Sequence, residues 1–143
     1  TSVRIALITK TVAEETNTKY AQGGIAAVWD TADSYEKHIQ DTMVAGDFLS
    51  DRSVVEMVVR EAPERLKELI SYGTQFDKKE DGSFDLVKEG GHSDKRILHY
   101  KDSTGNEIER ALLEKVKSYK EIDFFTVINF NELHLLPHII VIN

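Results

Sequence analysis

The chain has 143 residues, of which 18 are Lys or Arg, 25 are Asp or Glu and none is Cys. This length, with 41% apolar residues, predicts one globular domain over residues 1–143 and excludes collagen-like and disulfide-stapled classes. The net charge of −7 argues against nucleic-acid binding through a broad basic surface. No apolar run is long enough to span a membrane, and the lack of Cys excludes thiol catalysis and fits a reducing, cytoplasmic setting.

The first predicted element is a strand. Ile5–Ile8 is apolar on both faces, which is typical of a parallel sheet covered by helices. Such a strand needs neighbours, and no strand precedes it in the sequence. We therefore expect the chain to be a fragment, or to begin inside a domain.

A polar run followed by paired glycines predicts a loop at 16–24. Gly23 and Gly24 tolerate a positive φ or the close approach of another backbone. A loop that turns its N–H groups outward can hold an anion such as phosphate. A plain turn is the simpler interpretation, and both stay open at this point.

Two helices follow, and both are predicted to be scaffold. A capping-box pattern predicts a helix over 33–45, with Gly46 as its stop. Asp51 caps a longer helix over 51–72, which Pro63 should kink or divide. The apolar stripe of this second helix consists of Val54, Val55, Val58, Ala62, Leu66, Leu69 and Ile70.

The middle of the chain predicts short strands. Residues 74–77 and 83–87 flank Asp81–Gly82, which is a hairpin signal. A further short strand is predicted at 96–100. These segments give the domain a partly α+β character.

The last predicted helix and strand lie in 104–128. Thr104–Glu107 has the pattern of a capping box and opens a helix to about residue 119. Its predicted buried face consists of Ile108, Leu112 and Val116. A strand is expected at 124–128, and the apolar tail 130–143 is ambiguous, with pairing to a sheet edge or to a partner as one interpretation.

Residues 89–92 are the strongest candidates for binding a substrate or moving a proton. Two glycines leave room for a flat ligand near the backbone, and a carboxylate and an imidazole flank them. A glycine turn with two solvated polar residues is the plain alternative. Arg96 could clamp a carboxylate or phosphate, but a surface salt bridge to Asp94 or Asp102 is favoured by spacing alone.

No metal site is predicted. His134 and His138 have the i, i+4 spacing of a zinc-protease helix, but Leu135 occupies the place of the required Glu and Pro137 interrupts the helix. Nucleophile-elbow and P-loop motifs are absent from the sequence, so hydrolase and P-loop NTPase functions have no support.

Two stretches taken together resemble the L-aspartate oxidases, within the fumarate reductase and succinate dehydrogenase flavoprotein family. They are Asn-Thr-Lys-Tyr-Ala-Gln-Gly-Gly-Ile-Ala-Ala-Val at 17–28 and Glu-Gly-Gly-His-Ser-x-x-Arg-Ile-Leu-His at 89–99. Two shorter motifs, Asp41-Thr-x-x-Ala-Gly and Asp102-x-Thr-Gly, also resemble the family and follow in the same order along the chain. The resemblance runs from about residue 5 to residue 119.

The resemblance implies an α/β fold, namely an incomplete FAD-binding domain of the glutathione-reductase type. It implies that Lys10 and the stretch 17–24 line the FAD site, and that the family's Gly-x-Gly-x-x-Gly loop and substrate-capping domain lie outside this chain. The implied cofactor residues are Lys10, Asn17, Thr18, Lys19, Tyr20, Ala21, Gln22, Gly23 and Gly24. A cation and backbone amides suit a pyrophosphate.

Two residues favour L-aspartate oxidase within that family. Asn17 stands where many relatives have a flavin-linking His, so FAD should be non-covalent. Glu89 matches an acidic residue near the substrate amine, where a carboxylate can hold an ammonium ion and take up its proton.

The implied reaction converts L-aspartate into iminoaspartate, with oxygen or fumarate as the final electron acceptor, in NAD biosynthesis. The product would pass to quinolinate synthase. We expect this chain alone to be inactive. The alternatives are a soluble fumarate reductase or succinate-type dehydrogenase, and a non-catalytic assembly fragment that self-associates through its apolar tail.

Overall fold

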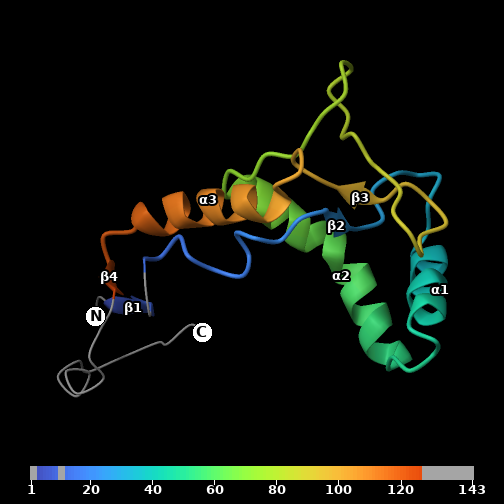
Figure 1. Cartoon of the computed structure of the whole chain (residues 1–143), viewed down its shortest axis with the longest axis horizontal. Coiled ribbons are helices and arrows are strands. Elements are labelled where there is room, and N and C mark those ends of the chain that lie inside the picture. Colours follow the sequence, from blue (N-terminus) through green and yellow to red (C-terminus); the bar gives the residue numbers. More distant parts are fainter. Residues whose placement is uncertain (1–2, 10–11, 127–143) are drawn as a thin grey trace.

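The fold is an elongated arrangement of short sheets and helices. The computed structural model describes residues 3–9 and 12–126, and in these ranges it contains three helices and four strands. A parallel strand pair lies at one end and a helix pair at the other, with a long helix and a small antiparallel pair between them (Figure 1). Lys10, Thr11 and the tail 130–143 lie outside the described residues, as do His134 and His138.

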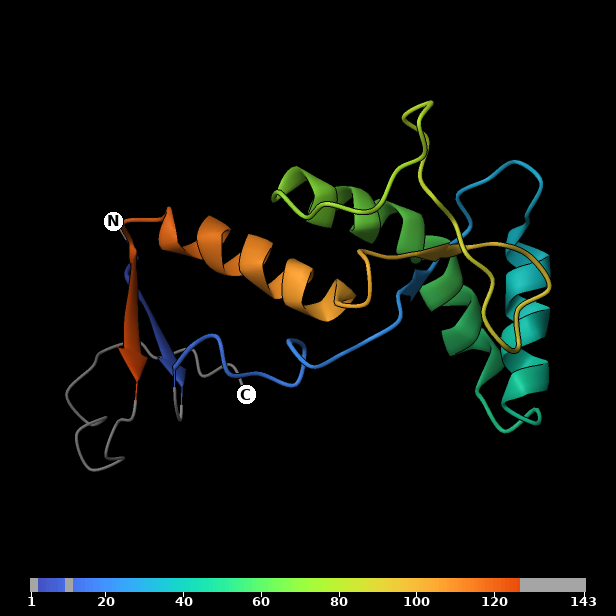
Figure 2. The same cartoon turned by 45° about the horizontal axis from the view of Figure 1, so that its top comes forward.

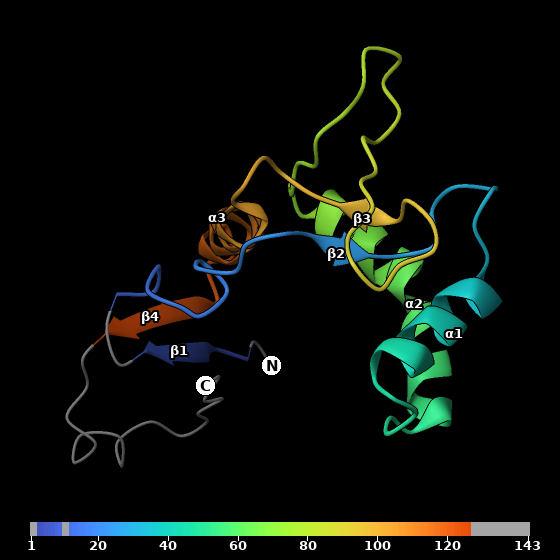
Figure 3. The same ribbon diagram turned by 45° about the vertical axis from the view of Figure 1, so that its right-hand side comes forward.

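The parallel pair consists of β1 (Ile5–Thr9) and β4 (Ile122–Thr126). Ile5 is paired with Ile122 and Thr9 with Thr126, so the two strands are in register over their whole length (Figure 3). This pairing confirms the predicted parallel sheet. Ala6 is buried in β1, and its other four residues are half-buried.

The strand predicted at 96–100 forms only over two residues, and it belongs to an antiparallel pair that the sequence did not predict. This pair joins β2 (Ile25–Ala26) to β3 (Ile97–Leu98), with Ile25 opposite Leu98. The adjoining core consists of Ala27, Leu66, Phe76, Leu86 and Leu98, with Trp29 and Phe84 at its edge.

The predicted strands at 74–77 and 83–87 are wrong as regular strands. Only two isolated bridges form, from Lys78 to Phe84 and from Val87 to Ile97. The predicted turn does form, since the Lys79 N–H donates to the Ser83 carbonyl at 2.9 Å. The resulting hairpin projects away from the helices (Figures 1 and 3). No strand from 3–9 or 12–126 lies along its outer side, so a regular ladder does not extend there.

Helices α1 (Tyr35–Ala45) and α2 (Arg52–Ser71) pack against each other and confirm the predicted positions. The N-cap of α1 is Ser34, which accepts a hydrogen bond from the Lys37 N–H. Asp51 caps α2 through the N–H groups of Ser53 and Val54. Pro63 does not divide α2, but the helix axis changes direction between its two halves (Figure 2).

The predicted apolar stripe of α2 is partly wrong. Val59 and Leu66 are buried, at 3% and 2% exposure, whereas Val54 and Val58 are about half exposed, at 50% and 56%. Val59 joins Ile39 and Met43 of α1 in a second small core. The contact with α1 selects the face of the helix that is buried.

Helix α3 (Thr104–Lys117) begins where predicted, but the predicted capping box is wrong. Its N-cap is Ser103, which makes no side-chain capping bond. Glu107 instead accepts a hydrogen bond from the Gln75 N–H at 2.8 Å, so its side chain makes a tertiary contact. The predicted buried residues Ile108, Leu112 and Val116 are only half-buried, and the fully buried positions of α3 are polar or small.

No helix within 3–9 and 12–126 combines the length and the apolar character needed to cross a membrane.

Candidate functional site

The 16–24 loop is a compact turn whose last residues offer backbone donors. The Lys19 N–H donates to the Thr16 hydroxyl at 3.2 Å, and the Ala21 N–H donates to the Thr18 carbonyl at 3.0 Å. Among the described residues, nothing accepts a hydrogen bond from the N–H groups of Gln22, Gly23 or Gly24. Consecutive free N–H groups are suited to bind anionic or carbonyl oxygens.

The two glycines of this loop have different structural roles. Gly23 has a φ of +74°, a conformation that L side chains rarely adopt. Gly24 lies against β3, where a Cβ would be 2.5 Å from Ile97 Cγ2 and closer still to the Leu98 carbonyl oxygen. Both properties expected of the pair, a positive φ and a close approach, are therefore confirmed.

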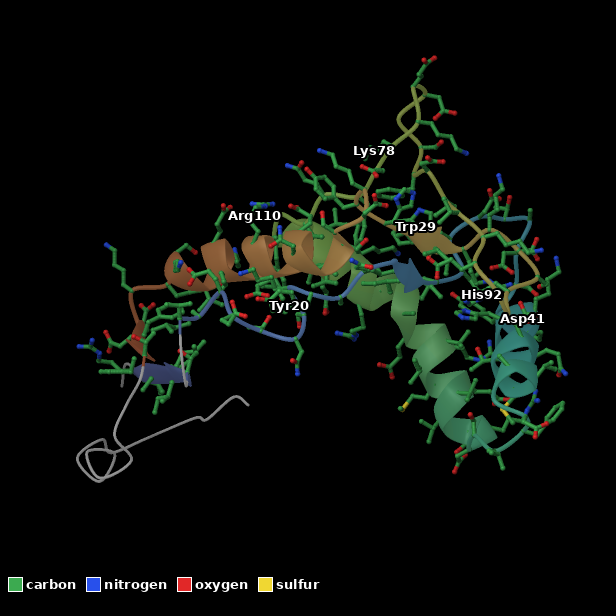
Figure 4. All side chains as sticks on the ribbon, viewed as in Figure 1. Tyr20, Trp29, Asp41, Lys78, His92 and Arg110 are labelled. Atoms are coloured by element: carbon green, nitrogen blue, oxygen red, sulfur yellow. The ribbon has the colours of Figure 1, made fainter. Side chains whose placement is uncertain are left out.

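The first turn of α3 supports the loop from the other side. The Gly105 N–H donates to the Ala21 carbonyl at 3.1 Å, and the Thr104 hydroxyl donates to the Gly23 carbonyl. A Cβ on Gly105 would be 2.8 Å from the Ala21 oxygen and closer still to the Thr18 carbonyl oxygen. Loop carbonyls thus face α3. Tyr20 extends below α3 and is exposed (Figure 4).

Glu89 lies directly beside the loop. If Gly23 had a Cβ, this atom would be 3.4 Å from Glu89 Oε1. Glu89 is exposed, and it begins a turn in which the His92 N–H donates to its carbonyl at 3.3 Å and Gly91 has a φ of +83°. The structure therefore brings together two groups that were predicted separately, the carboxylate and the glycine loop.

Arg96 corrects a prediction. It is fully buried and is not a surface residue paired with Asp94 or Asp102. Its Nε and Nη2 donate to the two carboxylate oxygens of Asp33 at 2.7 and 2.8 Å, and its Nη1 donates to Asp41 Oδ2 at 2.6 Å. The guanidinium is thus saturated by internal partners, which leaves it unable to clamp a ligand.

The two carboxylates stay ionised in this buried network. Burial would raise the pKa of Asp33, but hydrogen bonds from Arg96 and the Ser34 N–H outweigh it and lower that pKa. Burial likewise opposes the lowered pKa of Asp41, which is set by hydrogen bonds from Ser93 and Arg96. Arg96 and its partners therefore form an ion cluster that persists at neutral pH.

Histidines occupy the edge of this cluster. His38 of α1 is buried, and its ring centroid lies 5.6 Å from that of His92. Burial lowers the pKa of His38, and the nearby Arg96 adds to this effect. Within the described ranges, no group of three or more His, Cys, Asp or Glu side chains is placed to hold a metal ion.

Comparison with known proteins identifies the family. Residues 2–138 match the family described as FAD binding domain. The chain belongs to this family. It is 53% identical over 121 residues to L-aspartate oxidase 2-a, chloroplastic, from Nicotiana tabacum, and 38% identical over 139 residues to L-aspartate oxidase from Acinetobacter baylyi. These matches cover 85% and 95% of this chain but only 19% and 26% of the relatives, so the chain spans about a fifth to a quarter of their length.

Solved structures have the same fold. The Mycobacterium smegmatis Sdh1 complex in the apo form matches 87% of this chain with a TM-score of 0.79 and 35% identity, and 23% of that chain is covered. E. coli quinol fumarate reductase with a FrdA mutation matches 87% with a TM-score of 0.81 and 31% identity, and 21% of that chain is covered. The FAD-binding flavoprotein fold with helices and short strands is therefore established for this chain.

The residues of the loop fit an FAD ligand. Free N–H groups at Gln22–Gly24 suit the oxygens of a nucleotide cofactor, and the side-chain-free surface at Gly23 allows a flat group to approach. The Glu89 carboxylate beside Gly23 disfavours a phosphate at this point. The Glu89 end of the loop therefore suits an ammonium group better than a phosphate.

Sequence reasoning missed the residues that support the site. Asp41 and Thr104 were noted only as parts of a pattern, and Asp33 only as a helix start. Their contacts join segments more than fifty residues apart, from Asp41 to Arg96 and from Gly23 to Thr104. The sequence signals for Asp41 and Thr104 were the short motifs at 41–46 and 102–105, and the signal for Asp33 was the capping-box pattern that begins there.

Proposed function

We propose that this chain forms part of the cofactor and substrate site of an FAD-dependent L-aspartate oxidase. The observation that supports it best is the Glu89 carboxylate beside Gly23 of the glycine loop. The names of relatives that are 38–53% identical favour the same substrate. Since the chain spans only part of those relatives, we expect it to be inactive alone.

In this proposal FAD, when bound, supplies a two-electron acceptor. Glu89 binds the substrate ammonium through a charge-assisted hydrogen bond and takes one of its protons. L-aspartate loses its α-hydrogen with the bonding electron pair and becomes iminoaspartate. The two electrons finally reduce oxygen to hydrogen peroxide or fumarate to succinate.

The loop 17–24 holds the cofactor without a covalent bond. Asn17 has an amide where a nucleophilic imidazole would be needed for a linkage. Of the remaining residues, Gln22 to Gly24 contribute backbone N–H groups, Thr18 to Ala21 complete the loop that presents them, and Lys10 supplies a cation. A domain of the glutathione-reductase type, completed by segments outside this chain, is the fold proposed for the whole site. Transfer of the product to quinolinate synthase and a reducing compartment stay predictions.

A soluble fumarate reductase or succinate dehydrogenase is the second candidate, and the similarity to the Sdh1 complex and to quinol fumarate reductase supports it. Glu89 favours the first candidate, because a dicarboxylate without an amine has no cation for this side chain to bind and would be repelled by it. Self-association of the chain through its tail is a third, non-catalytic candidate.

The proposal is tested in a complete enzyme. This chain would replace the matching segment of the Nicotiana tabacum L-aspartate oxidase, with which it shares 53% identity over 121 residues. We expect the chimera to contain FAD and to release peroxide with L-aspartate but not with succinate. Glu89→Gln should lower turnover on the order of 100-fold or more, as for loss of a general base, with the FAD content unchanged. Glu80→Gln, in the projecting hairpin, is the matched control and should have no effect. Turnover of succinate alone, or full activity of Glu89→Gln, would refute the proposal.

A further inference from the structure

The turn that contains Glu89 has little support of its own. Glu89, Gly90 and Gly91 are all exposed, and the turn leaves the core at the Val87–Ile97 bridge and returns there. Paired glycines give this turn many alternative conformations in the absence of other contacts. The position of the carboxylate therefore depends on the residues that follow it.

One carboxylate oxygen of α1 fixes those following residues. Asp41 Oδ2 accepts hydrogen bonds from the Ser93 N–H at 2.7 Å, from the Ser93 hydroxyl at 2.8 Å and from Arg96 Nη1 at 2.6 Å. His92 and Asp41 lie next to each other where the turn meets α1 (Figure 4). Three donors on one oxygen define the place of the turn along the helix.

Two further contacts keep this arrangement rigid. Arg96 is held from its other side by the bidentate pair with Asp33, which stands just before the N-cap of α1. The turn also rests on the helix surface, because a Cβ on Gly91 would be 3.5 Å from Ala45 Cβ. Helix α1 and the turn therefore behave as one unit.

We propose that Asp41 is a positioning residue for Glu89. It touches neither substrate nor cofactor in this scheme. It holds the 89–96 segment against α1, so that the Glu89 carboxylate stays beside Gly23. This inference rests on the proposed function, since it assigns Asp41 an effect on the reaction only through Glu89.

The test uses the complete chimera and measures the anaerobic rate at which L-aspartate bleaches the flavin absorbance. We expect Asp41→Asn to lower this rate about 10- to 100-fold and Ser93→Ala about 2- to 5-fold, as for a misplaced catalytic group, with Ser93→Thr restoring part of the loss. FAD content per polypeptide should stay at the parental value. Asp94→Asn is the matched control, because it removes the Asp94–Lys37 ion pair between the same turn and the same helix, outside the Arg96 cluster.

A double-mutant cycle separates positioning from a general structural role. In a Glu89→Gln background, Asp41→Asn and Ser93→Ala should cause no further loss, because the group that they position is gone. An equal loss in both backgrounds, or a parallel fall in FAD content, would overturn the inference while leaving the proposed function intact. If Glu89→Gln itself has no effect, the proposed function and this inference both fail.

Discussion

Replacing Gly105 by Ala tests whether α3 holds the 16–24 loop by close contact. Helix propensity alone predicts a gain, because Ala is more favourable than Gly in a helix by about 1 kcal/mol. The structure instead predicts that Gly105→Ala lowers the stability of the fold. A Cβ at this position would be 2.8 Å from the Ala21 carbonyl oxygen and 2.9 Å from Ala21 Cβ, and it would approach the Thr18 carbonyl more closely still.

The size of the effect follows from what must move. Each neighbour named above is backbone or the first side-chain atom, so no flexible side chain can rotate away. Overpacking of this kind costs about 1–3 kcal/mol. Lengthening the Gly105–Ala21 hydrogen bond, which is 3.1 Å long, would cost roughly a further 1 kcal/mol. After the helix gain is subtracted, we expect a net loss of about 1–3 kcal/mol.

The assay is thermal unfolding of the 143-residue chain followed by circular dichroism. For a chain of this size the melting temperature should fall by roughly 3–10 °C. Gly90→Ala is the control, because an added Cβ there has nothing within 4 Å, and it should leave the melting temperature nearly unchanged. A higher melting temperature for Gly105→Ala would mean that propensity outweighs the contact, and would refute the argument that α3 supports the loop.

Three further predictions concern the ion cluster and the core. Arg96→Met leaves the buried Asp33 carboxylate without its charged partner and should cost about 3–5 kcal/mol in urea unfolding. Loss of the exposed Arg60–Glu36 pair through Arg60→Ala should cost under about 1 kcal/mol, and similar losses for the two variants would contradict the role of burial. Burial lowers the pKa of His38 below its ordinary value of 6.5. When the pH falls below 6.5, His38 therefore takes up a proton in the unfolded chain but not in the folded chain. The contribution of His38 to the free energy of unfolding should be complete above pH 6.5 and should decrease as the pH falls below it. Denaturant midpoints between pH 7 and 5 should show this slope, at most about 1.4 kcal/mol per pH unit, and His38→Gln should flatten it. Leu66→Ala should lower the free energy of unfolding by about 2–5 kcal/mol, because Leu66 is only 2% exposed. Val58 is 56% exposed, so Val58→Ala should change this free energy by no more than about 0.5 kcal/mol. Equal effects of the two variants would show that the buried face of α2 is assigned wrongly.

Local patterns predicted the elements whose stabilising contacts are local. Asp51 accepts hydrogen bonds from N–H groups two and three residues further on, so the cap of α2 could be predicted from a short window of sequence. The capping-box pattern that begins at Asp33 predicted the start of α1 but not its cap, which is Ser34, because the Asp33 carboxylate binds Arg96. The parallel partner of β1 was expected from its two apolar faces. Its identity as β4, more than a hundred residues away, has no local signal.

The same local rules were wrong where a distant partner competes. Thr104 and Glu107 have the spacing of a capping box, but the Thr104 hydroxyl donates to the Gly23 carbonyl and Glu107 binds the Gln75 N–H. The predicted partners of Arg96 were close in sequence, and the actual ones lie 63 and 55 residues away. A buried polar side chain bonds to whatever the tertiary fold places beside it, and this placement is invisible in a short window.

The motifs that resemble the flavoprotein family include residues that support the fold internally as well as the residues proposed to face a ligand. Asp41, Arg96 and Gly105 all fall within these motifs, yet each of them contacts another segment of this chain. Glu89 and Gly23 lie at the exposed surface that these contacts build. A free loop with two glycines and an exposed carboxylate could not hold the carboxylate of Glu89 beside the backbone donors of the loop, because each would sample many conformations. The ion cluster under one segment and the first turn of α3 under the other remove this freedom, so the motif spacing is explained by the contacts between segments as much as by the chemistry of the ligand.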